Sequence, residues 1–444
     1  MKSIQYLLPV LIFLGLLLSG CGQQNKPDEN KSIDRPNIII VFVDDMGYGD
    51  LGCFGSETIR TPRIDGLAEE GMRFTDFYVQ PVCGPSRSAL LTGRYPFRSG
   101  GWGMPGSEIT FAELLKTVGY TTGCIGKWDC SNRKDIQGRV PNDQGFDYYW
   151  GPLGANDRGT VYVWDNRDSI GPDPDMAGLT RKYTDKAIGF IEKNKEEPFL
   201  LYLAHTMLHV VVDASPEFKG NSDNGLYGDA AEELDFHTGR LLDKIEKLGL
   251  RENTIVLFTS DNGPWSNDQE KQRKKNNGAL AWGSAGPLRE AKGSTWEGGM
   301  RVPCIVRWPG VVQAGRTSQA IFSSIDLLPT FATLTGYKVP DDRIIDGVDQ
   351  TELLMGSLEE GKREHLYYFS NDYLHGVRQG RWKLLLPDRK DYRSYVNDKG
   401  TDGIELYDLE TDIGESVNVA DKHPEIVKRL QDLVEQLPNY KEPD

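Results

Sequence analysis

The chain has 444 residues, which is long enough for two or three domains at roughly 150 residues each. Hydrophobic residues make up 38% of the chain and charged residues 26%, which excludes disorder as the dominant state. The 51 Lys and Arg residues and 66 Asp and Glu residues leave a net charge of −15. So acidic a protein repels phosphate backbones, and non-specific nucleic-acid binding is excluded.

The N-terminus predicts an export signal over residues 1–20. Lys2 precedes an apolar run from Leu7 to Leu18, which is too short to span a bilayer as a helix. The run ends in Leu18-Ser19-Gly20-Cys21, which resembles a bacterial lipobox. We expect Cys21 to be lipidated and to anchor the chain in the bacterial cell envelope, periplasmic or at the outer-membrane surface, with residues 21–35 as a polar tether. The alternative is an ordinary secretory signal with an incidental Cys.

Residues 36–357 predict an α/β domain. Continuous apolar, β-branched runs are typical of strands buried on both faces, and they occur at 37–43, 119–125, 199–204, 254–259 and 302–308. Helical patterns lie between them at 108–118, 180–195 and 227–248. Strands that alternate with helices favour a mixed, mostly parallel sheet with helices on both faces.

Residues 358–444 have a different pattern. Short strand-like segments joined by turns occur at 366–370, 373–378, 382–386 and 405–408, and a helical segment follows at about 425–437. We expect a smaller C-terminal subdomain made of an antiparallel sheet and a helix.

Polar side chains follow four of the predicted buried strands, where ligands bind in open parallel sheets. They are Asp44 and Asp45, then Lys127, then His205 and His209, and finally Asp261 and Asn262. Three carboxylates at one edge would repel one another unless a cation neutralised them. Oxygen-only ligation favours Ca²⁺ or Mg²⁺ over zinc. A zinc site on the two histidines lacks the accompanying Glu of a metalloprotease.

Cys83 is predicted to begin a helix, because Pro85 suits a first turn and Gly93 suits a C-terminal end. The N–H groups and dipole of a helix N-terminus attract anions, and Arg87 lies one turn further on. A low-pKa catalytic thiol is the general interpretation of such a Cys. Only three residues separate Cys83 from Arg87, fewer than in a phosphatase-type loop. An exposed thiolate would also oxidise in an exported protein.

The segment Cys83-Gly84-Pro85-Ser86-Arg87, with Leu90 and Thr92-Gly93-Arg94 after it, resembles the sulfatase signature that begins Cys-x-Pro-Ser-Arg and ends Gly-Arg. The resemblance extends over nearly the whole mature chain, through residues 36–38, 44–45, 126–128, 259–263, 292–299 and 406–415. It implies the fold of alkaline phosphatase with a smaller C-terminal subdomain.

The resemblance also implies a mechanism. Cys83 would be oxidised to formylglycine by a formylglycine-generating enzyme or an anaerobic sulfatase-maturating enzyme. The hydrated aldehyde would attack the sulfur of a sulfate ester, and its second hydroxyl would then expel sulfate. A Ca²⁺ ion would be held by Asp44, Asp45, Asp261, Asn262 and the modified Cys83.

Further roles follow for the remaining residues of the motifs. Arg87 would stabilise the hydrate and hold the carboxylates, and Lys127 and Lys292 would clamp sulfate oxygens. His209 would protonate the leaving oxygen, while Asp261 would accept the proton of the attacking hydroxyl. His205 is the weaker candidate and is equally well explained as a histidine of the core.

One position departs from the family pattern, which has His after Gly-Lys-Trp. This chain has Asp129 there. We expect Asp129 either to serve as the base for the elimination of sulfate or to mark an altered pocket. The following segment, Cys130 to Arg133, has no assigned role. Cys124 and Cys130 either pair or remain buried thiols, and the states of Cys53 and Cys304 stay open.

Sulfate esters outside cells occur mostly on polysaccharides and glycosaminoglycans, so we expect a sulfated carbohydrate substrate. Candidate sugar contacts, each also explicable as a packing or surface residue, are Asn156, Asp157, Arg158, Trp164, His375 and Arg378. Two alternatives remain. One is a phosphodiesterase or phosphonate monoester hydrolase of the same superfamily, and the other is a glycan-binding pseudoenzyme inactivated by the change at position 129.

Overall fold

The structure of the protein is a computed structural model that describes residues 35–131, 138–265, 282–387, 389, 396, 398 and 400–441. These residues belong to one compact unit. Cys21, the predicted export signal and Arg133 lie outside the described residues. Among the helices of the described part, none has the length and apolar character needed to cross a membrane.

The larger sheet has 11 strands in the order β10-β2-β9-β8-β1-β7-β3-β4-β5-β6, with β11 also paired to β2. Its strands are β1 (Asn37–Val43), β2 (Met72–Tyr78), β3 (Thr121–Gly126), β4 (Tyr148–Pro152), β5 (Val161–Asp165), β6 (Asp168–Asp173), β7 (Phe199–Ala204), β8 (Thr254–Ser260), β9 (Arg301–Arg307), β10 (Arg316–Ser318) and β11 (Phe322–Ser323). All five strands predicted for this region are present.

Strand directions determine which ends of the strands meet. β1 pairs in parallel with β7 and β8, and β3 pairs in parallel with β7 and β4. The carboxyl ends of β1, β3, β7 and β8 therefore lie at one edge of the sheet. β9 is antiparallel to β8 and β2, so its amino end joins this edge. The mixed, mostly parallel fold predicted from the sequence is confirmed.

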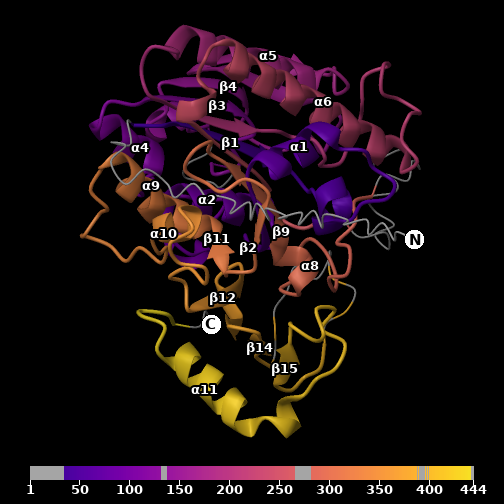
Figure 1. The fold of residues 1–444 in the computed structure, drawn as a ribbon, viewed down its shortest axis with the longest axis vertical. Coiled ribbons are helices and arrows are strands. Elements are labelled where there is room, and N and C mark those ends of the chain that lie inside the picture. Colours follow the sequence, from indigo (N-terminus) through magenta and orange to yellow (C-terminus); the bar gives the residue numbers. More distant parts are fainter. Residues whose placement is uncertain are drawn as a thin grey trace, which may run out of the picture. The chain divides into compact units, whose positions relative to one another are not determined.

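Residues of β1 alternate between two cores, as expected for a strand covered on both faces. Ile38, Ile40 and Phe42 belong to the core shared with α2, α4 and α9. Ile39, Val41 and Val43 belong to the core shared with α1, α5 and α6; Figure 1 shows α5 beside β4. The helices are α1 (Pro62–Glu70), α2 (Cys83–Thr92), α3 (Pro96–Ser99), α4 (Phe111–Thr117), α5 (Leu179–Asn194), α6 (Gly225–Lys247), α8 (Glu297–Met300), α9 (Leu327–Thr335), α10 (Thr351–Leu354) and α11 (Pro424–Glu435).

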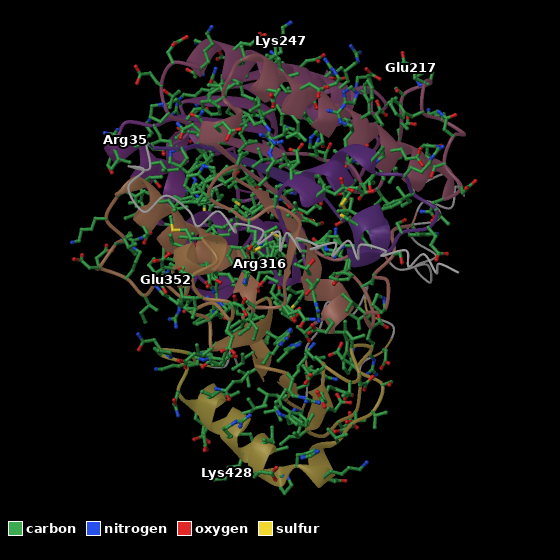
Figure 2. All side chains as sticks on the ribbon, in the orientation of Figure 1. Arg35, Glu217, Lys247, Arg316, Glu352 and Lys428 are labelled. Atoms are coloured by element: carbon green, nitrogen blue, oxygen red, sulfur yellow. The ribbon has the colours of Figure 1, made fainter. Side chains whose placement is uncertain are left out.

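The smaller sheet is antiparallel throughout, in the order β12-β13-β14-β15. Its strands are β12 (His365–Ser370), β13 (Tyr373–Gln379), β14 (Trp382–Leu385) and β15 (Glu405–Asp408). α11 buries Leu430 in the core of this sheet, while Lys428 on its outer side is 78% exposed (Figure 2). The predicted C-terminal sheet and helix are thus confirmed. The subdomain boundary predicted after residue 357 falls in the segment between α10 and β12.

Candidate active site

The carboxyl ends of β1 and β8 place a group of acidic residues at one point. Asp44 and Asp45 follow β1, Asp261 follows β8, and all three side chains are completely buried. With the Cys83 sulfur, they offer four ligand atoms that lie within 4.8 Å of one another. The backbone of Asp45 is left-handed, with φ of 62°, and its N–H donates to Asp261 Oδ1 at 3.2 Å. The edge of the sheet therefore concentrates negative charge as the sequence predicts.

Cys83 is the first residue of α2, and its side chain faces this acidic group. Its Sγ atom lies 3.3 Å from Asp44 Oδ1 and 3.2 Å from Lys292 Nζ. Burial, together with the carboxylates of Asp261 and Asp44, raises the pKa of the Cys83 thiol well above its ordinary value. The structure therefore does not support the low-pKa thiolate that a Cys at a helix N-terminus suggests.

Three buried cations surround the carboxylates. Lys127 Nζ lies 2.7 Å from Asp44 Oδ2, and Lys292 Nζ lies 2.5 Å from Asp45 Oδ1. Arg87 is fully buried, and its Nη2 lies 2.7 Å from Asp261 Oδ2. These cations explain the charge state of Asp44, because they outweigh the effect of burial and hold its pKa well below the ordinary value.

The donor set fits a divalent cation. Among the described residues, Asp45 Oδ2 and Asn262 Oδ1 are buried and have no hydrogen-bond partner. Burial and the nearby Asp44 carboxylate raise the pKa of Asp261 to about 7. Further positive charge at this point would therefore favour the ionised form of Asp261. Buried oxygen atoms that lack donors are what Ca²⁺ or Mg²⁺ would satisfy.

Asp129 lies beside the cluster as well. Its Oδ2 atom is 3.4 Å from Lys127 Nζ, and only 4% of the residue is exposed. Its backbone is left-handed with φ of 57°, and its N–H donates to the Leu153 carbonyl. Lys127 is therefore shared between two carboxylates, one from the acidic group and one from the position that departs from the family pattern.

His209 lies at the cluster, whereas neither ring nitrogen of His205 has a hydrogen-bond partner among the described residues. His209 Nε2 is 3.8 Å from Asp45 Oδ2, and its Nδ1 is 2.5 Å from the Val210 carbonyl, which fixes the ring. Burial and then Lys292 lower the pKa of His209. His205 packs against Tyr183, and burial lowers its pKa to about 3, as for a histidine of the core.

Sequence reasoning missed an aromatic contact at this site. The Trp265 ring lies 4.5 Å from Lys292 Nζ and 5.7 Å from the His209 ring, so one indole packs against both side chains. Its position two residues after the Asp261–Gly263 motif was the available signal.

The candidate sugar contacts have separate placements. Asn156 is buried and donates to the carbonyls of His209 and Val211, while Asp157 and Arg158 are exposed. Trp164 packs against the core. His375 is 1% exposed and lies 3.1 Å from Thr295 Oγ1. Arg378 is 6% exposed and pairs with Asp76 at 2.7 Å, so these last two side chains have little surface for a sugar to contact.

The cysteines of the described part are free thiols. Cys124 and Cys130 are both completely buried in the same core, which decides between the two alternatives in favour of buried thiols. Cys304 is buried as well, and Cys53 is partly exposed.

Two family models match the chain. The model described as Sulfatase matches residues 36–337, which include every residue of the cluster. The model described as N-sulphoglucosamine sulphohydrolase, C-terminal, matches residues 291–441. Together they span both sheets.

Individual proteins agree with these models. An N-acetylgalactosamine-6-O-sulfatase of Bacteroides thetaiotaomicron is 33% identical, over 98% of this chain and 99% of its own. Steryl-sulfatase of Rattus norvegicus is 36% identical over 77% and 74% of the two chains. A structure described for the metabolism of multiple glycosaminoglycans by Bacteroides thetaiotaomicron has a TM-score of 0.81 at 30% identity, over 91% and 99%. The chain belongs to the sulfatase family and is a sulfuric ester hydrolase.

Proposed function

We propose that the protein is an exported sulfatase that hydrolyses sulfate esters of polysaccharide or glycosaminoglycan sugars, using a formylglycine formed from Cys83 and a bound Ca²⁺. The observation that carries this proposal is the placement of Cys83 Sγ, 3.3 Å from Asp44 Oδ1 and 3.2 Å from Lys292 Nζ. A nucleophile at this position lies beside carboxylates that could hold a cation and beside an ammonium that could bind an anion.

Asp44, Asp45, Asp261 and Asn262 would hold the calcium ion. Their oxygen atoms suit a hard cation, and the buried, unpartnered oxygens of Asp45 and Asn262 support this ligand set. When bound, the ion would supply positive charge beside a sulfate oxygen. Arg87 keeps two of the ligands in place, since its Nη2 is 2.7 Å from Asp261 and 3.9 Å from Asp44.

The remaining polar residues would handle the anion and its protons. A formylglycine at position 83 would supply a hydroxyl nucleophile that can be regenerated after each turnover. Lys127 and Lys292 would bind the anionic oxygens of the substrate. His209, oriented by the Val210 carbonyl, would hold a proton at Nε2 for the leaving oxygen. Asp129 would accept the proton whose loss releases sulfate, and its distance of 3.4 Å from Lys127 Nζ supports this role.

The carbohydrate assignment is supported by the share of this chain that a sugar sulfatase and a steryl-sulfatase each match. The N-acetylgalactosamine-6-O-sulfatase match covers 98% of it, whereas the steryl-sulfatase match covers 77%. The net charge of −15 opposes a polyanionic substrate at long range. Salt screens distant charges over about 8 Å at physiological ionic strength, so the nearby charges of Lys127 and Lys292 would dominate the electrostatic interaction with the substrate anion.

Export and lipid anchoring are supported by the sequence Leu18-Ser19-Gly20-Cys21 after an apolar run. An enzyme held in the cell envelope would meet sulfated polysaccharides before they enter the cell. Maturation of Cys83 then requires a formylglycine-generating or anaerobic sulfatase-maturating enzyme in the same host.

The test is a substrate panel with protein purified from its native host. We expect release of inorganic sulfate from 6-O-sulfated N-acetylgalactosamine and other sulfated sugars, at higher kcat/KM than from steryl or aryl sulfates. Cys83→Ala should abolish release, whereas Cys53→Ala, at a partly exposed thiol, should retain it.

Two outcomes would overturn the proposal. Faster hydrolysis of matched phosphate or phosphonate esters would indicate a phosphodiesterase or phosphonate monoester hydrolase. Binding of sulfated oligosaccharides without any turnover would indicate a pseudoenzyme.

A further inference from the structure

A buried group of charged residues joins the smaller sheet to the segment that carries Lys292. Lys383 of β14, Glu297 of α8 and Glu415 are all completely buried. Lys383 Nζ lies 2.9 Å from Glu297 Oε1, 2.7 Å from Glu415 Oε1 and 2.9 Å from the Thr295 carbonyl. The ammonium group thus donates hydrogen bonds to Glu297 and to the Thr295 carbonyl, and it forms an ion pair with Glu415.

Glu297 connects this group to two further strands. Its Oε2 accepts a hydrogen bond from Tyr78 at 2.6 Å, and its Oε1 accepts one from Tyr368 at 2.8 Å. Tyr78 ends β2, in the segment that leads to Cys83, and Tyr368 belongs to β12. Burial raises the pKa of Glu297, but Lys383 and the nearby arginines lower it to about 2, so the carboxylate stays charged.

The segment from Lys292 to Glu297 is fixed at both ends. The Lys292 N–H donates to the Pro264 carbonyl at 2.9 Å, and the Gly293 N–H donates to the Pro81 carbonyl at 2.7 Å. Pro264 follows the metal-ligand loop and Pro81 precedes Cys83. Lys383 holds the other end through the carbonyl of Thr295. A residue of the smaller sheet therefore contacts the backbone of the segment that begins at Lys292.

We propose that Lys383 is a positioning residue for Lys292, so that the smaller sheet sets the place of an ammonium that binds the substrate anion. The identity of that anion as sulfate rests on the proposed function. A buried ion pair is weak evidence for a purely stabilising role, because the desolvation cost offsets much of the attraction. A role in positioning the Lys292 segment explains why Lys383 donates a hydrogen bond to the backbone carbonyl of Thr295, three residues after Lys292.

The solution experiment measures competitive inhibition by inorganic sulfate in wild type, Lys383→Met, Lys292→Met and the double variant. We expect Lys383→Met to raise the inhibition constant about tenfold or more, the size expected for a lost charged hydrogen bond, and Lys383→Arg to restore part of it. In the Lys292→Met variant, adding Lys383→Met should not raise the inhibition constant further. Additive effects, or an unchanged inhibition constant in folded Lys383→Met, would overturn the proposal.

Two further variants separate positioning from stability. Arg363→Met removes another buried cation, which pairs with Asp326 at 2.9 Å, and should lower the melting temperature without changing the inhibition constant. Glu415→Gln keeps the size of the side chain and removes the negative charge that lies 2.7 Å from Lys383 Nζ, so it provides a milder variant if Lys383→Met does not fold. It should raise the inhibition constant by a smaller factor, and no change in folded Glu415→Gln would contradict the proposal.

A crystal structure of Lys383→Met tests positioning without any turnover. We expect Lys292 Nζ to move from its place 2.5 Å from Asp45 Oδ1. An unmoved Lys292 would refute the proposal even if the protein is a sulfatase. Failure of wild type to hydrolyse any sulfate ester would instead refute the proposed function and leave the displacement of Lys292 to decide this inference.

Discussion

At the scale of single residues, the site is a balance of buried charges. Asp44, Asp45, Asp261 and Asp129 contribute four carboxylates, while Arg87, Lys127 and Lys292 contribute three cations within salt-bridge distance of them. An unpaired buried charge costs several kcal/mol, so each member constrains the others. A divalent cation and an anionic substrate would enter together without leaving a large net charge.

The proposed role of Asp129 predicts a split between chemistry and binding. Asp129→Asn should lower kcat by roughly 10²-fold or more, because a positioned base is lost. The same variant should bind inorganic sulfate more tightly, because Lys127 Nζ loses a carboxylate 3.4 Å away. Steady-state kinetics and sulfate inhibition measure both, and Asp129→Glu is the control that retains the charge. An unchanged kcat in Asp129→Asn would show that the residue is no base.

Metal removal gives a second prediction. A cation that binds only the folded state raises the melting temperature by mass action. We expect a higher melting temperature in Ca²⁺ than in EDTA, and loss of this difference in Asp45→Asn. Glu359→Gln, at a side chain 86% exposed, should retain it. Equal melting temperatures in both buffers, with no cation found by elemental analysis, would argue against the site.

At the scale of elements, the strands that bear the site were predictable and several of their neighbours were not. β1, β7 and β8 are continuous apolar runs, so their burial and the position of the residues after them follow from the sequence. β2 mixes buried and partly buried residues and carries Arg73 and Asp76, so its pattern is weaker. The antiparallel direction of β9 was not predictable, because hydrophobic pattern is the same in either direction.

The packing of α1 against α6 gives a prediction on pH. Asp235 is 3% exposed and accepts hydrogen bonds from the N–H groups of Arg63 and Ile64, at 3.0 and 2.8 Å, near the start of α1. Burial raises its pKa from 3.8 to about 6. A carboxyl with a raised pKa stabilises the fold below its unfolded pKa, and this contribution is lost as the pH rises through the folded pKa.

We therefore expect the free energy of unfolding of wild type to fall relative to that of Asp235→Asn between about pH 4 and about pH 7, by up to about 3 kcal/mol. Urea denaturation at both pH values measures this difference. Asp243→Asn, at a side chain 64% exposed, is the control and should show little change. A difference between wild type and Asp235→Asn that is the same at both pH values would refute the expected pKa.

At the scale of the whole molecule, the smaller sheet takes part in the site as well as in the fold. The sequence predicts two sheets, and both are present. It does not predict that Lys383 reaches the Thr295 carbonyl, because the two residues are far apart in the chain and only tertiary packing brings them together. The same reason hid the contact of Trp265 with Lys292 and His209.

The proposed envelope location predicts a covalent lipid on Cys21. The native protein should partition into the detergent phase and incorporate radiolabelled palmitate in its host. Cys21→Ser should abolish labelling, while Cys53→Ser should not. Palmitate labelling that persists in Cys21→Ser would contradict the anchor.

The chemical state of residue 83 tests the central claim most directly. Mass spectrometry of the peptide that carries this residue should be performed on protein from the native host that releases inorganic sulfate from a sulfated sugar. The account predicts the mass of the aldehyde or its hydrate at position 83. An intact thiol there, in protein that still releases sulfate, would contradict it.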